Sequence, residues 1–247
     1  MPIAALDLPP RAGLAQASRL GFRAVTLSAA QPGLRPRELD RSARRGLRAE
    51  LRRLELTCVG VDLFVPPEHF VQADQLDRAI AAVEAALQLA DDLEARVLFL
   101  RLPPTPDGEE PLEATRAIAA AAVGVRARVA DLSLDGPALE SVRSGGDLPI
   151  DIGLDTAAWL ASGLDPTEGI VELGDRLSGI RLVDLDVHGT RMPVSMSGRL
   201  DLGALRTGLE VGGFNGALVA DARGWSNPIE GLQQTLAMWR ASGDLEG

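Results

Sequence analysis

The chain has 247 residues, of which 46% are hydrophobic and 24% are charged, so it is long enough to bury one large core or two small ones. All 25 basic residues are arginine, which excludes lysine Schiff bases, lysine-anchored pyridoxal phosphate and lysine-containing phosphate loops. The net charge of −10 argues against nucleic-acid binding, and Cys58, the single cysteine, excludes a disulfide framework and a cysteine-rich zinc site.

Residues 1–7 show no basic segment followed by a long apolar one, so we expect no secretion signal. No run approaches the roughly 18 apolar residues of a membrane span. We therefore expect a soluble, cytoplasmic protein that binds neither membranes nor nucleic acid.

Short apolar runs alternate with longer amphipathic segments along the chain. In the first half we expect strands at residues 3–6, 22–27, 57–63, 96–100 and 125–132. The helices expected between them span residues 10–20, 35–54, 76–90 and 111–123. In the second half we expect strands at residues 149–155, 179–184 and 217–221. Helices are expected at residues 137–143, from Asp165 onwards, at 202–211 and at 228–241, with an irregular loop from the 179–184 strand to residue 198.

Eight strand–helix units in a chain of this length predict an α/β protein, a single (β/α)8 TIM barrel over residues 1–247. A doubly wound open sheet is the alternative, but no glycine-rich phosphate turn follows the first predicted strand. Neither a linker nor a composition shift divides the chain, so we expect one domain. Active sites of such barrels lie at the carboxyl ends of the strands, and candidate site residues are therefore sought there.

Polar side chains occupy the predicted strand ends, at Asp7, Thr26, Asp62, Arg101, Asp131, Asp155, Asp184 and Asp221. Buried carboxylates are costly unless they are paired, so this set indicates a divalent-cation or sugar site. For any single aspartate, capping of the following helix is the more common role. Asp155 and Asp221 differ from the others because neither is followed by an obvious helix start.

Four segments match, in order, the motifs of one barrel family. Residues 20–27 (LGFRAVTL) resemble its Leu-Gly-Phe-x-x-Val-Glu-Leu, and residues 153–158 with 163–166 resemble its Leu-Asp-x-x-His and later Gly-x-Asp-Pro. Residues 180–184 (IRLVD) resemble its His-x-Lys-Asp. Residues 198–201 and 213–221 resemble its Gly-x-(Val/Leu)-Asp loop and its Gly-Tyr-x-Gly-x-(Val/Leu)-x-x-Glu closing strand. The chain thus resembles the xylose isomerase-like TIM barrels, a superfamily of sugar-phosphate isomerases and epimerases.

The resemblance implies a site with one divalent ion held by two Glu, one Asp and one His, in which the two Glu act as acid and base. This chain keeps the Asp as Asp155, has Asp221 in place of the closing-strand Glu, and offers Asp131 nearest to the other. Thr26 stands at the Glu that commonly ends the family's second strand, and Ala158 at its substrate-contacting His. The chain therefore departs from the family at most of the positions that carry its chemistry.

Arg181 matches the position of the family's metal-binding His. A guanidinium is permanently protonated and has no lone pair to donate to a metal. Two unit charges about 4 Å apart interact by roughly 4 kcal/mol at an effective dielectric of 20, so Arg181 and a divalent ion would exclude each other. We hypothesise that Arg181 replaces the ion and bridges Asp155 and Asp221. No cofactor is expected; Mn, Mg or Zn would be held by Asp155, Asp221 and Asp131 only if this interpretation fails.

The candidate site falls into two groups of residues. Catalysis, if present, is assigned to Asp131, Asp155, Asp221 and Arg181, and substrate binding to Arg101, Asp184, His188 and Arg223. An exposed loop position is the alternative explanation for His188, and Cys58 is expected to be an inert core thiol. The arginines within residues 35–53 are expected to pair with acids.

Two functions stay open at this stage. The first is a sugar or sugar-phosphate isomerase or epimerase that transfers a proton next to a carbonyl, with Arg181 stabilising the enediolate. The second is a non-catalytic barrel that binds a small anion, a sugar or a protein; an oligomer is compatible with either. The two differ in whether the aspartates are free to titrate around an open pocket or are tied into a closed ion-pair network.

Overall fold

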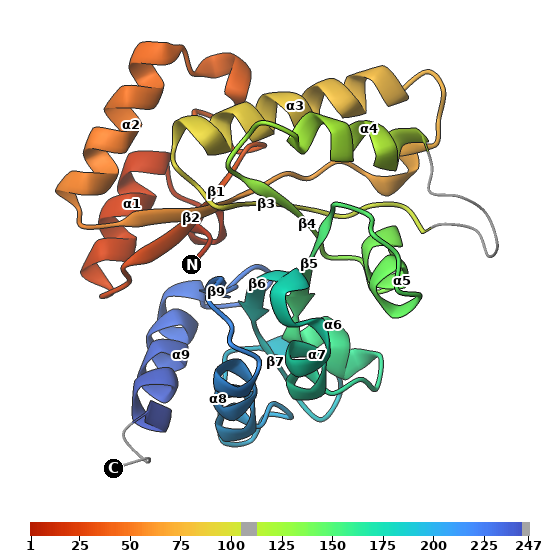
Figure 1. Cartoon of the computed structure of the whole chain (residues 1–247). Helices are drawn as coiled ribbons and strands as arrows, with labels where there is room; N and C mark the ends of the chain where they lie inside the picture. Colours follow the sequence, from red (N-terminus) through yellow and green to blue (C-terminus); the bar gives the residue numbers. More distant parts are fainter. Residues whose placement is uncertain (105–112, 244–247) are drawn as a thin grey trace.

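The computed structural model describes residues 1–104 and 113–243. Within these residues, seven parallel strands form one sheet in the order β1-β2-β3-β4-β5-β6-β9. They are β1 (Ala24–Ser28), β2 (Thr57–Asp62), β3 (Val97–Leu100), β4 (Arg128–Asp131), β5 (Asp151–Asp155), β6 (Leu177–Leu182) and β9 (Ala217–Ala220). The spatial order follows the chain, and the sheet curls until its edge strands β1 and β9 contact each other, so the predicted α/β barrel class is confirmed (Figure 1).

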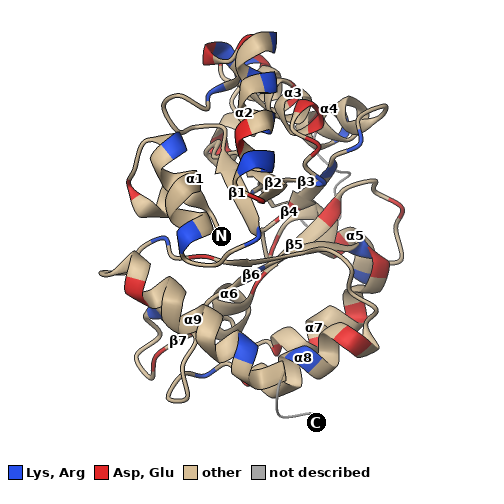
Figure 2. Ribbon diagram, turned by 90° about the vertical axis from the view of Figure 1, so that its left-hand side faces the viewer, with Lys and Arg blue, Asp and Glu red and all other residues tan. Residues whose placement is uncertain are grey.

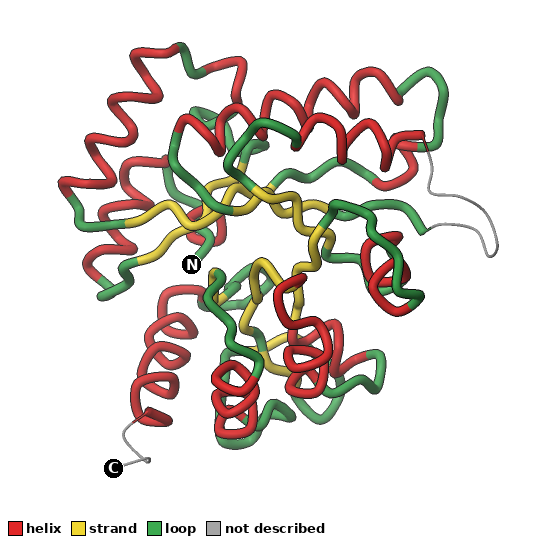
Figure 3. Tube along the Cα trace, viewed as in Figure 1, coloured by secondary structure: helices red, strands yellow, loops and turns green. Residues whose placement is uncertain are grey.

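Helices connect the strands and cover the outer side of the sheet (Figure 3). They are α1 (Pro10–Arg19), α2 (Arg41–Arg53), α3 (Leu76–Asp92), α4 (Glu113–Ala122), α5 (Pro137–Arg143), α6 (Thr156–Ala161), α7 (Pro166–Leu173), α8 (Leu202–Val211) and α9 (Pro228–Gly243). Short 3-10 turns are η1 (Ile3–Leu6), η2 (Pro36–Glu38), η3 (Pro67–Phe70) and η4 (Gly174–Arg176). Among the described helices, none combines the length and apolar character that crossing a membrane requires.

The expected first strand at residues 3–6 is wrong, because this segment forms the 3-10 turn η1. Its place beside β1 is taken by Met1 and Pro2: the Thr26 N–H donates to the Met1 carbonyl at 2.9 Å, and Pro2 makes a single parallel bridge with Thr26. Pro2 has no N–H to donate to a ladder. Asp7 ends the turn in a left-handed conformation at φ 51° and is exposed, so it does not reach the barrel interior.

Other differences from the expected elements are local. The helix expected over residues 35–54 begins only at Arg41, because the Asp40 side chain caps it by accepting the Ala43 N–H at 2.7 Å. The loop expected up to residue 198 contains a small antiparallel ribbon, formed by β7 (Asp184–Leu185) and β8 (Arg191–Met192). Of the helix expected at 111–123, residues 111 and 112 lie outside the described residues.

Arginines on α2 pair with acids as expected, since Arg44 contacts Asp92 of α3 at 2.5 Å and Arg53 contacts Glu50 at 2.7 Å. Figure 2 shows acidic and basic positions interspersed over the outer helices. The Arg44–Asp92 pair is partly buried, whereas Arg53 is 65% exposed and its pair with Glu50 contributes little to stability.

Phe99 fills the inside of the barrel below its carboxyl-terminal mouth. It clusters with Val97, Ala130 and Leu132, separately from the larger core between sheet and helices. Gly179 makes room for the ring, because a Cβ there would lie 2.4 Å from it. The Arg181 guanidinium lies over the ring at 5.5 Å from its centroid, so Phe99 forms the floor of the site described next.

Candidate functional site

Three carboxylates and three guanidinium groups meet at the carboxyl-terminal end of the barrel. The acids end β2 and β5 or directly follow β9, and the bases lie on β6, on β8 and just after β9; they are Asp62, Asp155, Asp221, Arg181, Arg191 and Arg223. Parallel strands all end at one edge of the sheet, which brings these distant parts of the chain together. We call these six residues the mouth network.

Arg181 lies at the centre of the mouth network and is 9% exposed. Its Nη2 donates to Asp62 Oδ1 at 2.5 Å, and its Nε lies 3.9 Å from Asp221 Oδ2. Asp62, at 6% exposure, is buried with it. A buried guanidinium with a bidentate shape is suited to linking carboxylates, and here it joins the ends of β2 and β9 across the barrel.

The expected bridge from Arg181 to Asp155 is wrong, because Arg191 takes that place. Arg191 Nη1 lies 2.9 Å from Asp155 Oδ1, and its Nη2 lies 3.8 Å from Asp221 Oδ2. The same Asp155 oxygen accepts the Ala158 N–H at 3.1 Å and so caps α6, although no helix start was expected after this strand. Capping holds the Asp155 carboxylate toward α6, within reach of the β8 ribbon.

Arg223 closes the mouth network. It contacts both oxygens of Asp221, with Nε at 2.7 Å from Oδ1, and its Nη1 lies 3.6 Å from Asp62 Oδ2. Burial alone raises the pKa of Asp221, but the hydrogen bonds and charge of Arg223 and the charge of Arg181 bring that pKa below its usual value. Asp221 is therefore held ionised, which agrees with the second of the two alternatives left open by the sequence, a closed ion-pair network.

The residues of the mouth network do not fit a divalent ion. Each of its three carboxylates contacts at least one guanidinium, and a guanidinium has no lone pair to coordinate a metal. In residues 1–104 and 113–243, no group of three or more His, Cys, Asp or Glu side chains is arranged to hold a metal. We therefore derive no catalytic step through such an ion.

A cavity of about 200 Å³ opens beside the mouth network. Its charged lining is Asp62, Arg181, Arg223 and Arg101, and its apolar lining includes Phe99 and Phe64. Arg101 is exposed and makes no ion pair within the described part of the chain, and Phe64 is 75% exposed. Three positive groups thus face one negative group, and two of the predicted substrate-binding residues, Arg101 and Arg223, lie together here.

Asp131 lies apart from this cavity. Its register partners Leu100 and Ile152 belong to the core between sheet and helices, so its side chain points away from the barrel interior. Its Oδ1 accepts N–H groups from Leu102 at 3.1 Å and Ser133 at 2.9 Å, while its buried Oδ2 has no hydrogen-bond partner. Burial raises the pKa of Asp131 to about 6.

Asp184 and His188, which were also predicted to bind substrate, lie outside the mouth network. Asp184 is fully buried, and its Oδ1 accepts N–H groups from Leu185, Arg199 and Leu200, each at 2.8 Å. His188 is exposed at the turn of the β7–β8 ribbon, where its N–H donates to Asp186. Neither side chain lines the cavity beside the mouth network.

Sequence reasoning missed the parts played by Asp62, Arg191 and Phe99. Asp62 was recognised as a strand end, but no motif of the resembled family covers it. The role of Arg191 was not predicted because its segment was expected to be irregular. His188-Gly189 could have indicated a hairpin, since Gly189 adopts φ 81° and allows the turn of the ribbon. Cys58 is buried, and burial raises the pKa of its thiol to about 12, which agrees with an inert core residue.

Known structures share the fold of this chain, although its sequence has no match. No family model matches the sequence, and neither does any curated protein. A xylose isomerase domain protein from Planctomyces limnophilus superposes with a TM-score of 0.73 at 17% identity, covering 95% of this chain and 91% of that one. D-psicose 3-epimerase with D-tagatose from Clostridium cellulolyticum H10 gives 0.73 at 13% identity, covering 95% and 94%. The 3-keto-D-glucoside 4-epimerase from E. coli gives 0.71 at 15%, covering 95% of each chain.

The chain therefore has the xylose isomerase-like TIM barrel fold, as the sequence motifs indicated. The likeness extends over nearly the full length of both partners in each comparison. At these identities the likeness fixes the fold, and function has to be argued from the site itself.

Proposed function

We propose that this barrel binds a small anionic, sugar-like molecule at the mouth, without a divalent ion, and that the mouth network is structural. The proposal is carried by the lining of the cavity, where Arg101, Arg181 and Arg223 face a single carboxylate, Asp62. Arginine recognises carboxylate and phosphate groups through charge-assisted hydrogen bonds. The Phe64 and Phe99 rings supply apolar surface for the carbon skeleton of the ligand.

Arg101 is the arginine most available to an anionic ligand. Arg181 and Arg223 already hold Asp62 and Asp221, so much of their charge is balanced within the chain. Arg101 has no such partner among the described residues and stands at the open side of the cavity. Arg101 would therefore contribute most to the binding free energy of an anion, because no ion pair within the described residues has to break.

Calorimetric titration in EDTA tests this proposal with D-fructose, D-fructose 6-phosphate and D-gluconate. We expect the phosphate or the acid to bind and the neutral sugar to bind at least tenfold more weakly, since a hydrogen bond to a charged group contributes about 1.5–3 kcal/mol. Arg101→Gln should weaken anion binding by about tenfold or more. The control is Arg45→Gln, which alters an exposed arginine on α2 outside the cavity and should change nothing. Equal binding of neutral and charged sugars, or binding only with Mn²⁺, would contradict the proposal.

A second candidate function is a sugar isomerase or epimerase, favoured by the fold shared with several sugar epimerases. Proton transfer next to a carbonyl needs a carboxylate that can accept the proton. The carboxylate in the cavity is Asp62, whose oxygens face Arg181 at 2.5 Å and Arg223 at 3.6 Å. Chromatography of ketohexoses incubated with the protein, with and without Mn²⁺, distinguishes the two: interconversion would favour the enzyme, and we expect none.

A further inference from the structure

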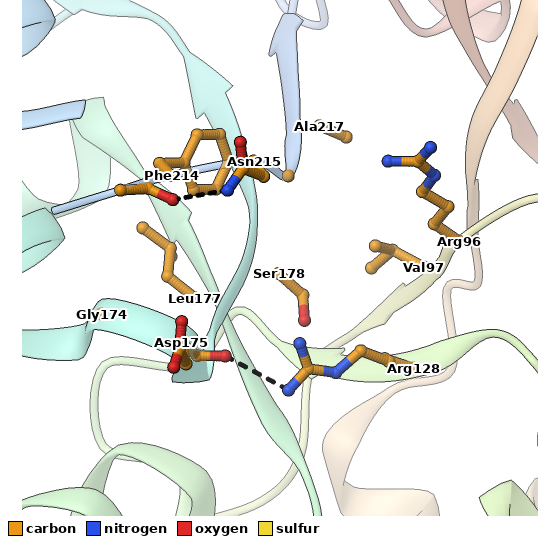
Figure 4. Close-up of a pocket in the computed structure, with 12 residues that line it drawn as sticks. Arg96, Val97, Arg128, Gly174, Asp175, Leu177, Ser178, Phe214, Asn215 and Ala217 are labelled. Atoms are coloured by element: carbon orange, nitrogen blue, oxygen red, sulfur yellow. Dashed lines mark hydrogen bonds between the residues drawn. The ribbon is translucent and has the colours of Figure 1, made fainter. Parts of the chain in front are cut away.

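A second cavity, of about 230 Å³, lies at the opposite end of the barrel, where the strands begin. Figure 4 shows it, with Arg96 and Arg128 on one side and Phe214 and Asn215 on the other. Arg96 directly precedes β3, Arg128 begins β4, and the opposite wall comes from the turn that leads into β9. None of the residues that line it lines the cavity at the mouth.

Arg128 is held in a fixed orientation at the edge of this second cavity, where its side chain is 54% exposed. Its Nη2 donates to Asp151 Oδ1 at 2.7 Å and to the Asp175 carbonyl at 3.2 Å, and its Nε contacts the other Asp151 oxygen. The Ser178 hydroxyl also donates to Asp151. Arg128 Nη1 makes no hydrogen bond within residues 1–104 and 113–243, and in Figure 4 it points toward Ser178, inside the pocket. A guanidinium oriented in advance loses little entropy when it binds a ligand.

Arg96 adds an unbalanced charge to this end of the barrel. It is exposed and has no ion pair in the part of the chain that the structure describes. The carboxylate of Asp151 is shared between Arg128 and Arg176, which lies 3.8 Å from it. Two arginines and one carboxylate, Asp175, line this small cavity, so its lining carries an excess of positive charge that favours an anion. A carboxylate matches the geometry of guanidinium donors.

The rest of the lining is mixed, since Asp175, Ser178 and Asn215 are polar, but one part of it is apolar. Phe214, Val97, Leu177 and Ala217 line it, and the Asn215 side chain is tied back to the Gly213 carbonyl at 2.9 Å. Gly216 keeps this wall open to the ring, because a Cβ there would lie 2.6 Å from both Phe214 and the Ser178 carbonyl. The cavity thus combines a cationic edge with an aromatic wall, which suits an amphipathic ligand more than inorganic phosphate.

We propose that this second cavity binds a small organic acid, with its carboxylate on Arg96 and Arg128 and its apolar body against Phe214. The site is separate from the mouth and does not depend on the function proposed there. Its position where the strands start, away from the usual place of catalysis in barrels, makes it a binding site with no catalytic step assigned.

Amide NMR of the full chain, titrated with benzoate, tests this proposal. We expect shift changes at Gly213, Asn215 and Gly216, with the neutral isostere benzamide and inorganic phosphate both binding at least tenfold more weakly. Arg96→Gln should weaken benzoate binding about tenfold, Phe214→Leu should also weaken it, and the exposed α2 variant Arg45→Gln should leave it unchanged. Shift changes confined to the mouth, equal binding of benzamide, or no shifts at millimolar benzoate would overturn it.

Discussion

Arg181 is the central residue of the mouth network. The sequence predicted correctly that this arginine would lie among carboxylates, because it lies on an apolar strand, at a position that the resembled family uses for a ligand. Of its two predicted partners, Asp221 lies 3.9 Å from Arg181, but Asp155 was wrong: Asp155 pairs with Arg191, and Arg181 contacts Asp62 instead. Which carboxylate a long side chain reaches depends on rotamers and on neighbouring caps, and neither is visible in spacing along the chain.

Asp131 shows how a strand-end acid can belong to the core. Its pKa is raised from an ordinary 3.8 to about 6 by burial, so between these values the folded chain holds more proton than the unfolded chain. The free energy of unfolding should therefore fall as pH rises through this range. The difference amounts to at most about 3 kcal/mol.

Comparison of Asp131→Asn with the unaltered chain isolates this effect. The free energy of unfolding from urea titration should fall more between about pH 4 and 7 in the unaltered chain than in Asp131→Asn, which cannot ionise. Glu84→Gln, an exposed position on α3, serves as the control and should leave the slope nearly unchanged. Parallel pH profiles for the unaltered chain and Asp131→Asn would show that this carboxyl is not the titrating group.

Asp184 holds the segment between β8 and α8 in place. Three backbone N–H groups converge on its Oδ1, and the Ser195 N–H reaches Oδ2 at 3.4 Å. Gly198 packs against this carboxylate so closely that a Cβ would lie 1.7 Å from Oδ2. The predicted strand-end acid thus fixes a loop through backbone hydrogen bonds.

Gly198→Ala should displace Asp184 and lower the free energy of unfolding by roughly 1–3 kcal/mol. Gly46→Ala is the matched control, since Gly46 lies within α2 and nothing comes within 4 Å of an added Cβ. That variant should raise the free energy of unfolding by about 0.5–1 kcal/mol, because alanine favours helices. Both values follow from urea denaturation, and an unchanged stability for Gly198→Ala would refute the role given to Asp184.

Most helices and strands followed from the sequence because their periodicity is strong. The helix over residues 76–90 and the strand over 96–100 agree with α3 and β3 within a few residues. The first strand failed since its four apolar residues suit a strand or a turn equally, and Pro2 weakens pairing there. The sequence did not predict α6, because Asp155 is both the last residue of β5 and the N-cap of α6, so no separate helix start is visible.

At the scale of the whole molecule, both ends of the barrel are held by buried charge. The mouth network joins β2, β5, β6 and β9 at the carboxyl-terminal end, and Asp151 joins β4, β5 and β6 at the other through Arg128 and Ser178. The barrel fold could be predicted from motifs spread along the chain. The network that fills its mouth could not, because ion pairing across a barrel depends on side chains more than a hundred residues apart, as with Asp62 and Arg181.

We propose that Arg181 and its partners occupy the position where barrels of the resembled family hold a divalent ion. The test is to measure the metal content of the chain after incubation with Mn²⁺ and removal of free ion, together with thermal unfolding in Mn²⁺ and in EDTA. We predict far less than one ion per chain and no difference in Tm, since a ligand that binds only the folded state would raise it. About one tightly held ion per chain, with a higher Tm in Mn²⁺ than in EDTA, would show that the mouth holds a metal ion despite these arginines.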